Sequence, residues 1–328
     1  MSNLTHVAVA IMIKKSSITQ CHEVLVSLRD KTAHQGGLWE FPGGKLEDGE
    51  SSYEALKREV SEELGVVVNK AKLFKTIRHQ YSDKPVLLDV WWVESFDGEF
   101  LYSDAENECK GAEGQSVKWQ PLKELKVNDF PTANRPIVYA LTLPEKYMIT
   151  GGFETQADFM LRLENSLKNG ISLVQLRCKK TPEAEIIKLA GEAQLICKQY
   201  NARLLLNTTL EVFNQLKADG LHLSSQQLYK FKKRPVDNVL LLSVSCHTQE
   251  DIMQADKLSA DIILLSPVKE TKSHPGVKGI GWSTFSDIVF KTATPVYALG
   301  GMNEADIIDA KQAGAQGVAA ISSFWNVR

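Results

Sequence analysis

Residues 44–66 read GKLEDGESSYEALKREVSEELGV, and this stretch decides how the first half of the chain is interpreted. It fits the pattern G-x5-E-x7-R-E-U-x-E-E-x-G-U, where U is a bulky aliphatic residue, at every fixed position. Ser51 followed three residues later by Glu54 predicts a capping box at the start of a helix. Gly65 is suited to the position just past the helix end. The stretch therefore predicts one helix with a defined beginning and end.

The same helix concentrates carboxylates on one face. Glu59, Glu62 and Glu63 are spaced i, i+3 and i+4, so their side chains share a face. Like charges at this spacing destabilise an isolated helix by about 0.2–0.5 kcal/mol per pair, and a hard divalent cation would turn the repulsion into coordination. A solvated acidic face is the alternative, but the match at every fixed position favours a Mg²⁺ or Mn²⁺ site.

The pattern is identified as a Nudix box, the signature of enzymes that hydrolyse a nucleoside diphosphate linked to another group. The resemblance implies a Nudix α/β/α sandwich with a mixed sheet, and a metal that generates or positions hydroxide. That metal is expected to be Mg²⁺, with Mn²⁺ as a possible substitute. The implied ligands are the carbonyl of Gly44 and the carboxylates of Glu59, Glu62, Glu63 and the loop residue Glu113.

Arg58, Glu59 and Glu63 are the predicted catalytic residues of the box, and their roles stay partly open. Glu59 is the expected base, although Glu63 or Glu113 could exchange roles with it. Arg58 lies four residues before Glu62 and is expected to orient that carboxylate rather than to touch substrate. A plain surface ion pair is the alternative for Arg58, and a solvated loop is the alternative for Glu113.

Residues outside the box resemble the MutT branch of the Nudix family, the sanitisers that hydrolyse 8-oxo-dGTP to 8-oxo-dGMP and pyrophosphate. This resemblance covers residues 5–142 and rests on residues 39–45 (WEFPGGK), 113–115 (EGQ) and 130–136 (FPTANRP). The implied nucleotide-binding residues are Arg29, Phe41, Lys45, Lys84 and Asn134. Asn134 would read the oxidised purine, since a side-chain amide can donate and accept hydrogen bonds at once.

Several of these assignments have a structural alternative. Asn134 could cap the last helix of this half, where asparagine is favoured, and Phe41 could belong to the core. Lys84 stands where well-known members of the branch carry arginine, and lysine cannot make the same planar, forked contact. This departure puts fine selectivity for the oxidised base in doubt. Another nucleoside diphosphate, or a thiamine-pathway pyrophosphate, is the alternative substrate.

Apolar runs mark the expected strands of both halves. In the first half they occupy residues 7–13, 23–27, 72–80, 87–95 and 116–121, and a helix is expected after Asn134. In the second half they occupy residues 147–150, 172–176, 203–206, 220–223, 239–244, 261–265, 295–299 and 317–321. Amphipathic stretches at residues 157–168, 182–199, 248–258 and 303–313 lie between many of them. This alternation predicts a (β/α)8 TIM-type barrel.

The barrel is expected to be truncated at its last helix, because the chain stops almost directly after the eighth strand. An apolar patch left there would need a partner surface, so a homodimer is a possible assembly.

Ends of the barrel strands resemble thiamine phosphate synthase and its relative TenI, a thiazole tautomerase, over residues 147–325. Barrel active sites form at such strand ends. Arg177 and Lys179 could hold a pyrophosphate, and glycine and serine pairs after the last two strands could cradle a phosphate. The implied ligand site comprises Gln175, Arg177, Lys179, Asn207, Ser245, His247, Thr271, Lys272, Gly300, Gly301, Ser322 and Ser323.

Two departures from this family predict a degenerate barrel. Thr208 follows Asn207 where synthases carry an aspartate that binds Mg²⁺, and residues 224–227 (SSQQ) supply no second carboxylate. Their loss predicts weak or absent synthase activity. His247 could still transfer protons in TenI-type chemistry, or it could be a buried structural histidine. An active TenI-like enzyme and a sensor of a phosphorylated thiamine-pathway ligand remain alternatives.

Length and composition suggest two domains, which we place at residues 1–143 and 144–328 of the 328. A net charge of −2 argues against nucleic-acid or membrane partners and favours small-molecule substrates. The five cysteines are scattered without a C-x-x-C pair, which indicates reduced thiols in a cytoplasmic protein. No apolar run is long enough for a membrane span, and the first strand lacks the flanks of a signal peptide.

Overall fold

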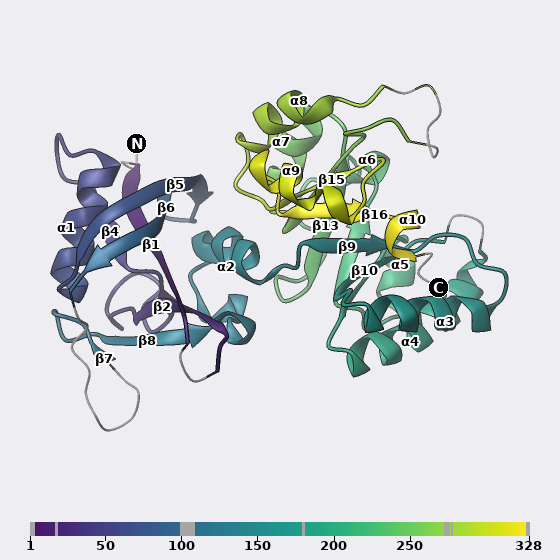
Figure 1. Cartoon of the computed structure of the whole chain (residues 1–328), viewed down its shortest axis with the longest axis horizontal. Helices are drawn as coiled ribbons and strands as arrows, with labels where there is room; N and C mark the ends of the chain where they lie inside the picture. The colour runs from purple at the N-terminus through teal and green to yellow at the C-terminus, as the bar shows by residue number, and fades with distance from the viewer. Residues whose placement is uncertain are drawn as a thin grey trace. The chain divides into compact units, whose positions relative to one another are not determined.

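The chain folds into two units, Met1–Thr142 and Leu143–Arg328, coloured in sequence order in Figure 1. This computed structural model describes residues 4–16, 19–98, 109–178, 181–271, 276 and 278–325. Within those ranges, no helix is long and apolar enough to cross a membrane.

A mixed sheet forms the centre of the first unit. β1 (Thr5–Lys15) runs parallel to β6 (Pro85–Asp97) and antiparallel to β2 (His22–Leu28), in the order β5-β6-β1-β2-β8-β7. β3 pairs with β2, and β4 pairs with β1. The remaining strands are β3 (Trp39–Glu40), β4 (Gly43–Lys45), β5 (Val67–Gln80), β7 (Cys109–Lys110) and β8 (Ser116–Pro121). The predicted mixed sheet is therefore confirmed.

Helix α1 (Ser52–Leu64) packs against β1, β4 and β5. The expected capping box is present: the Ser51 hydroxyl accepts from the Glu54 N–H at 3.3 Å, and the Glu54 carboxylate accepts from the Ser51 N–H at 2.8 Å. Gly65 ends the helix in the left-handed conformation, with a φ of 71°. Buried residues of α1 share one apolar core with the sheet, which includes Leu56, Val60, Met12 and Leu25. The polar face that remains carries the glutamates.

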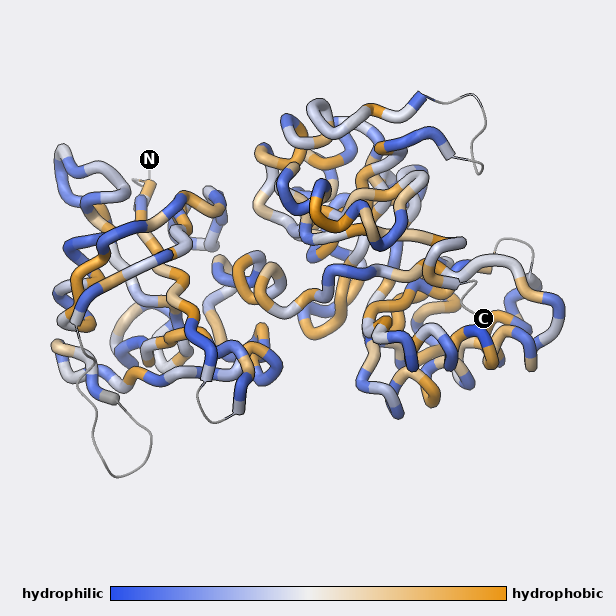
Figure 2. Tube along the Cα trace, in the orientation of Figure 1, coloured by the Kyte–Doolittle hydropathy of each residue, from blue (hydrophilic) through white to orange (hydrophobic). Residues whose placement is uncertain are grey.

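Three 3-10 turns and one helix complete the first unit. The turns η1 (Leu122–Glu124), η2 (Val127–Asp129) and η3 (Thr132–Asn134) lead into α2 (Arg135–Thr142). The sequence predicted the helix after Asn134 but not the turns. α2 buries Ile137, Val138 and Tyr139, and Figure 2 draws it mostly in hydrophobic colours.

Eight parallel strands close a barrel in the second unit, because β16 pairs with β9. The strands are β9 (Lys146–Ile149), β10 (Leu173–Leu176), β11 (Arg203–Leu206), β12 (Gly220–Leu223), β13 (Leu241–Cys246), β14 (Ile262–Leu265), β15 (Val296–Leu299) and β16 (Gly317–Ala320). Each lies within three residues of a predicted apolar run, and the TIM-type barrel is confirmed.

Helices follow most of these strands. They are α3 (Gln156–Lys168), α4 (Glu183–Gln199), α5 (Leu210–Phe213), α6 (Ser225–Leu228), α7 (Gln249–Lys257), α8 (Gly281–Val289), α9 (Ile307–Gln312) and α10 (Ser322–Trp325), with the 3-10 turn η4 (Glu304–Asp306) before α9. α10 is a single turn, as expected for the last helix. Its Trp325 is buried, packs on Phe159 at 4.9 Å between ring centroids, and donates from Nε1 to the Gly152 carbonyl at 2.9 Å. The aromatic residues of α10 are therefore core rather than an exposed apolar patch.

Candidate functional site

The glutamates of α1 are organised by one arginine. Arg58 holds Glu50 with two hydrogen bonds of 2.9 Å, and its Nη1 donates to Glu59 Oε1 and Glu62 Oε2 at 3.0 Å each. Its Nη2 also donates to the Lys45 carbonyl at 2.9 Å. The predicted contact with Glu62 is present, but Arg58 is a hub for three carboxylates rather than a partner of one. The arginine thereby ties the helix to the strand β4 that precedes it.

Two glycines let the β4 backbone approach these carboxylates. A Cβ atom added to Gly44 would lie 2.1 Å from the Cδ and Oε2 atoms of Glu59, so a larger residue would push that carboxylate out of its present position. Gly43 has a φ of 142°, and its N–H donates to Glu63 Oε2 at 3.0 Å. The two predicted carboxylates and the predicted Gly44 backbone are therefore brought together.

Burial and mutual repulsion both act on this acidic cluster. Burial raises the pKa of Glu63 to about 8, opposed by the Gly43 N–H and reinforced by the charges of Glu40, Glu59 and Glu113. Burial also raises the pKa of Glu59, although hydrogen bonding to Arg58 opposes that shift. Glu40, which the sequence analysis did not single out, therefore adds negative charge to the site.

Glu113 reaches the cluster from a turn that is fixed to the end of α1. The Glu63 carbonyl accepts the Ala112 N–H at 2.8 Å and the Gln115 Nε2 at 3.1 Å. The Glu113 side chain itself is exposed. Its charge nevertheless contributes to the raised pKa values of Glu59 and Glu63. The loop position is thus determined by these hydrogen bonds to the Glu63 carbonyl rather than by the Glu113 carboxylate.

Donor chemistry at this cluster fits a hard divalent cation. All the candidate donors are carboxylate or carbonyl oxygens, and the crowded negative charge is what such a cation would neutralise. Within the described residues, however, no three histidine, cysteine or acidic side chains are gathered closely enough to hold an ion as they stand. Arg58 holds the side chains of Glu59 and Glu62 in this arrangement.

The predicted nucleotide-binding residues lie on the strands and turns beside this cluster. Arg29 forms an ion pair with Glu40 and donates from Nε to the His34 carbonyl at 2.7 Å. Phe41 is buried and stacks on Phe130, with 5.2 Å between ring centroids, so it lies in the core, the alternative that the sequence left open. Lys45 is exposed and Lys84 is half-buried.

Asn134 is 7% exposed at the end of η3. Its side-chain amide has no hydrogen-bond partner in the part of the chain that the structure describes. Its amide atoms are also not among the fully buried, unpaired polar atoms of the described residues, so the amide keeps contact with solvent and is available to a ligand.

Two residues missed by sequence reasoning hold the turn that carries Asn134. The Tyr81 hydroxyl accepts the Ala133 N–H at 3.2 Å, and Gln35 Oε1 accepts the Thr132 N–H at 3.3 Å. Tyr81 also contacts His34 and His79 edge-on. These contacts join segments far apart in the sequence, so no local sequence pattern predicts them.

In the barrel, a buried histidine connects polar residues of neighbouring strands. His222 is 2% exposed and lies 2.9 Å from both Ser243 Oγ and Ser245 Oγ, and the Tyr147 hydroxyl reaches Ser243 Oγ at 3.3 Å. Burial, helped by the charge of Arg177, lowers the pKa of His222 to about 3, so the ring is neutral. Ser245 is therefore a hydrogen-bond partner of His222 inside the barrel. The sequence analysis named Ser245 as a site residue but did not single out His222.

Other predicted residues of the barrel site lie at the carboxyl ends of the strands. Gln175 is buried, and its Oε1 has no hydrogen-bond partner among the described residues. The Arg177 N–H donates to Thr150 Oγ1 at 2.9 Å, and burial lowers the pKa of the Arg177 guanidinium. Asn207 donates from Nδ2 to the His222 carbonyl at 3.1 Å. Lys179 and Lys272 lie outside the described residues, and Thr271 is half-buried.

His247 is exposed, so the expectation that it could be a buried structural histidine is wrong. Its Nδ1 contacts the Ser266 carbonyl at 2.8 Å. Among the described residues of the barrel, the buried histidine is His222. Gly300 and Gly301 both have positive φ, and a Cβ on either would come within 3.0 Å of the residues 267–270 segment. Ser322 and Ser323 are exposed, and Ser323 Oγ donates to the Met302 carbonyl at 3.0 Å.

Uncharged groups occupy the two segments where the resemblance to synthases would place metal-binding carboxylates. Gln227 Nε2 donates to the Thr208 carbonyl at 3.0 Å, and Gln227 Oε1 accepts from the Ser224 N–H at 3.0 Å in a capping box. No carboxylate takes part in these contacts. The two segments are therefore joined by hydrogen bonds between uncharged groups.

Comparison with known families assigns each half of the chain to a family. The thiamine monophosphate synthase family matches residues 146–324, and the NUDIX domain family matches residues 16–140. The chain belongs to both families. Its NUDIX domain carries the acidic cluster, and its synthase-like domain is the closed barrel.

Known relatives each resemble one domain of the chain. A putative thiamine-phosphate synthase 2 of Aquifex aeolicus is 37% identical over 56% of this chain and 99% of its own length. The 8-oxo-dGTP diphosphatase of Escherichia coli K12 is 35% identical over 37% of this chain and 86% of its own length. A solved MutT structure, from work on Aliivibrio salmonicida and Vibrio cholerae, is 30% identical, covers 43% of this chain and 98% of that chain, and has a TM-score of 0.33.

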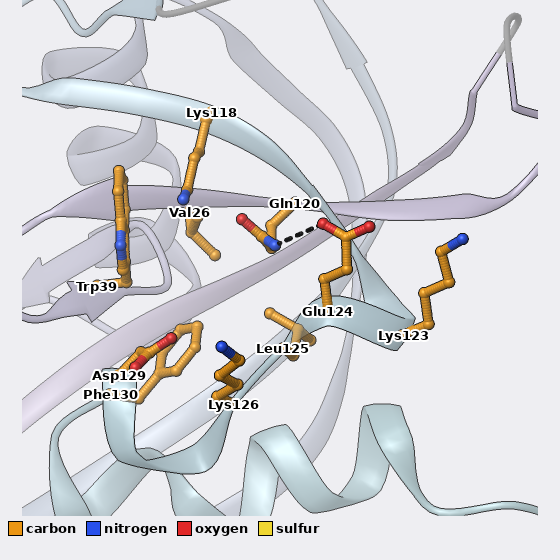
Figure 3. Close-up of a pocket in the computed structure, with 10 residues that line it drawn as sticks. All are labelled: Val26, Trp39, Lys118, Gln120, Lys123, Glu124, Leu125, Lys126, Asp129 and Phe130. Atoms are coloured by element: carbon orange, nitrogen blue, oxygen red, sulfur yellow. Dashed lines mark hydrogen bonds between the residues drawn. The ribbon is translucent and has the colours of Figure 1, made fainter. Parts of the chain in front are cut away.

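A cavity of about 380 Å³ in the NUDIX domain is lined by none of the acidic residues described above. It lies between β8 and the turns η1 and η2 (Figure 3). The glutamates of α1, rather than this cavity, are the candidate hydrolytic site, because the acidic charge suited to a divalent cation and a diphosphate is gathered there.

Proposed function

We propose that the NUDIX domain hydrolyses 8-oxo-dGTP to 8-oxo-dGMP and diphosphate, which removes an oxidised nucleotide before it is used in DNA synthesis. The observation that carries the choice of substrate is the buried Asn134 amide without a hydrogen-bond partner among the described residues. Leaving one partner of such a hydrogen bond unpaired in a ligand-filled site costs about 1–3 kcal/mol, so a base edge that pairs with the Asn134 amide gains selectivity. The likeness to the E. coli 8-oxo-dGTP diphosphatase supports the same substrate.

In this proposal Glu59 accepts the proton of the attacking water at Oε2. Arg58 occupies Oε1, and no hydrogen bond from a described residue reaches Oε2, which leaves that oxygen for water. Arg58 fixes the direction of the carboxylate and does not need to touch the substrate. The Glu63 carboxylate accepts a hydrogen bond from the Gly43 N–H, which fixes its position relative to β4.

Gly44 and four carboxylates would hold the divalent cation in this proposal: Glu59, Glu62, Glu63 and Glu113. Mg²⁺, or Mn²⁺ in its place, would neutralise phosphate oxygens and lower the pKa of water there. Arg29 and Lys45 supply positive charge toward the nucleotide side of the cluster. Tyr81 and Gln35 keep the turn that bears Asn134 in position.

Product analysis tests this proposal. Full-length protein with Mg²⁺ is incubated with 8-oxo-dGTP, dGTP, ADP-ribose or thiamine diphosphate, and the products are separated by anion exchange. We expect 8-oxo-dGMP and diphosphate as the fastest-formed pair, and no reaction in excess chelator. Preference for thiamine diphosphate, or release of single phosphate from 8-oxo-dGTP, contradicts the assignment.

For the barrel we propose ligand binding without synthase turnover. The observation in favour is the uncharged Gln227–Thr208 contact where anionic metal ligands would be needed. Strand-end groups such as Arg177 and the Gly300–Gly301 turn are still suited to a phosphorylated thiamine-pathway compound. Calorimetry with thiamine phosphate should show binding, while complementation of a synthase-deficient strain by this half alone would overturn the proposal.

A further inference from the structure

Tyr81 lies where the end of β5 meets the turn η3. It directly follows β5, which packs against η3. Its N–H donates to the Lys84 carbonyl at 3.0 Å, within the turn that leads into β6. Two histidines contact its ring edge-on, His34 at 4.8 Å and His79 at 4.5 Å between ring centroids. Backbone and ring are both held, so the hydroxyl has a defined position.

The Tyr81 hydroxyl uses only part of its hydrogen-bonding capacity. It accepts the Ala133 N–H at 3.2 Å, but no described residue accepts a hydrogen bond from it. A phenolic hydroxyl can donate and accept at once. Burial raises the pKa of Tyr81, so the hydroxyl keeps its proton and remains a donor at neutral pH. Its hydrogen is therefore available to water in the free protein and to a ligand when one binds.

This hydroxyl and the Asn134 amide lie at the same turn. Ala133, which donates to Tyr81, directly precedes Asn134, and consecutive Cα atoms are only about 3.8 Å apart. The Asn134 side chain likewise has no hydrogen-bond partner among the described residues. Two polar groups with unused capacity thus lie beside η3, one on the turn and one at the end of β5. A base read by Asn134 comes within reach of the Tyr81 hydroxyl.

We propose that Tyr81 is a second base-reading residue of the NUDIX domain, whose hydroxyl donates a hydrogen bond to a carbonyl oxygen of the bound purine. The inference rests on the proposed function, because it concerns the nucleotide that Asn134 would read. Guanine presents an acceptor, O6, where adenine presents an amino donor, and oxidised guanine has a second carbonyl at C8. The Tyr81 oxygen already accepts the Ala133 N–H, so a carbonyl suits it better than an amino group. Tyr81 therefore favours oxopurines over aminopurines.

Calorimetry on the full-length protein tests this role with 8-oxo-dGMP, dGMP and dAMP, which hold no diphosphate to release. Tyr81→Phe removes the hydroxyl and keeps the ring between His34 and His79. We expect its affinity for 8-oxo-dGMP to fall about fivefold to tenfold, as for one neutral hydrogen bond, and its affinity for dAMP to change less than about twofold. Equal losses for the two ligands, or no loss in folded protein, overturn the inference.

Gln35→Ala is the matched control for a purely structural role. Gln35 Oε1 accepts the Thr132 N–H at 3.3 Å, so it holds the same turn as Tyr81 does. We expect this variant to weaken 8-oxo-dGMP and dAMP by similar factors, because it removes a contact of the turn and no contact with the base. If it lowers the ratio of the two affinities as much as Tyr81→Phe does, the shape of the turn alone sets the selectivity, and the inference is wrong.

The wild-type affinities separate this inference from the proposed function. Tighter binding of 8-oxo-dGMP than of dGMP is expected if the domain reads oxidised guanine, and equal affinity contradicts that preference. In that event Tyr81→Phe should still lower the ratio of dGMP affinity to dAMP affinity, because O6 is present in only one of the two bases. An unchanged ratio would then overturn the role of Tyr81 as well.

Discussion

Arg58 is bonded to three carboxylates at once, and this leaves Glu59 with one oxygen directed by the protein and one available to water. Changing Glu59→Gln removes the negative charge and the proton-accepting oxygen but almost no volume. We expect kcat to fall by about 10²–10⁴-fold, measured as initial rates of diphosphate release. Glu47→Gln is the control in the exposed loop before α1 and should retain wild-type rate. Near-normal turnover in Glu59→Gln would remove this residue from the mechanism.

At the base-reading position, Asn134→Ala replaces the buried amide with a methyl group. We expect the ratio of kcat/KM for 8-oxo-dGTP to that for dGTP to fall by about tenfold or more, since one selective hydrogen bond is worth about 1–3 kcal/mol. Rates with both substrates give the ratio directly. Equal losses for the two nucleotides would indicate that Asn134 has a structural role only.

Glu63 gives the domain a pH-dependent stability. Its pKa is raised by burial from 4.5 in the unfolded chain to about 8 in the folded one, so its contribution is fully present below about pH 4.5. That contribution is lost as the pH rises through about 8, because the folded state must then carry a buried charge. We expect the urea midpoint of the metal-free NUDIX domain to fall between about pH 5 and about pH 8. The fall should be larger in the wild-type protein than in the Glu63→Gln variant. Parallel pH profiles of the two proteins would contradict this assignment.

At the scale of single residues, the sequence predicted only the contacts that follow from local spacing. The fixed spacing within residues 44–66 was sufficient to place Arg58 beside Glu62. The bidentate contact with Glu50, the charge of Glu40 and the Tyr81 support of the Asn134 turn each need segments brought together by the sheet. Such contacts leave no periodic signal in the sequence.

At the scale of elements, α1 owes its position to its caps as well as to its apolar face. Ser51→Ala removes the hydroxyl that accepts the Glu54 N–H, which typically costs about 1 kcal/mol of stability. We expect the urea midpoint of the NUDIX domain to fall accordingly, with kcat little changed under conditions where the protein stays folded. Ser52→Ala is not a suitable control, because its hydroxyl accepts from Trp91 Nε1. Ser82→Ala is better, because Ser82 is exposed between β5 and β6 and its hydroxyl makes no hydrogen bond with a described residue. An equal loss in Ser82→Ala would exclude a specific capping effect.

Elements with strong periodicity were predicted well, and short or polar ones were missed. α3 and α4 begin within one residue of their predicted starts because their apolar residues recur at helical spacing. α8 was missed, since Gly281 and the serine and threonine residues of its first turn have low helix propensity. The stretch predicted as one helix at residues 303–313 divides into η4 and α9, where the Asn303 side chain caps a 3-10 turn first.

At the scale of the whole molecule, each domain has its own core and its own candidate site. We therefore propose that residues 1–143 form an independent hydrolase. A fragment ending at residue 143 should keep kcat/KM for 8-oxo-dGTP within about threefold of the full chain, because no residue assigned to the hydrolytic site lies in the barrel. Complete loss of activity in a fragment that is folded by circular dichroism would indicate coupling between the domains.

The barrel was predictable as a whole because eight apolar runs separated by crossovers admit few other arrangements. Its internal chemistry was less accessible, since burial, and not identity, distinguishes His222 from His247.

The ratio of kcat/KM for 8-oxo-dGTP to that for dGTP, measured with Mg²⁺ on the full-length protein, tests the central claim most directly. We predict a preference of at least about 10²-fold for the oxidised nucleotide, because a site built to hydrogen-bond one base edge rejects another that leaves it unpaired. A ratio near one would contradict the assignment of the NUDIX domain to oxidised nucleotides.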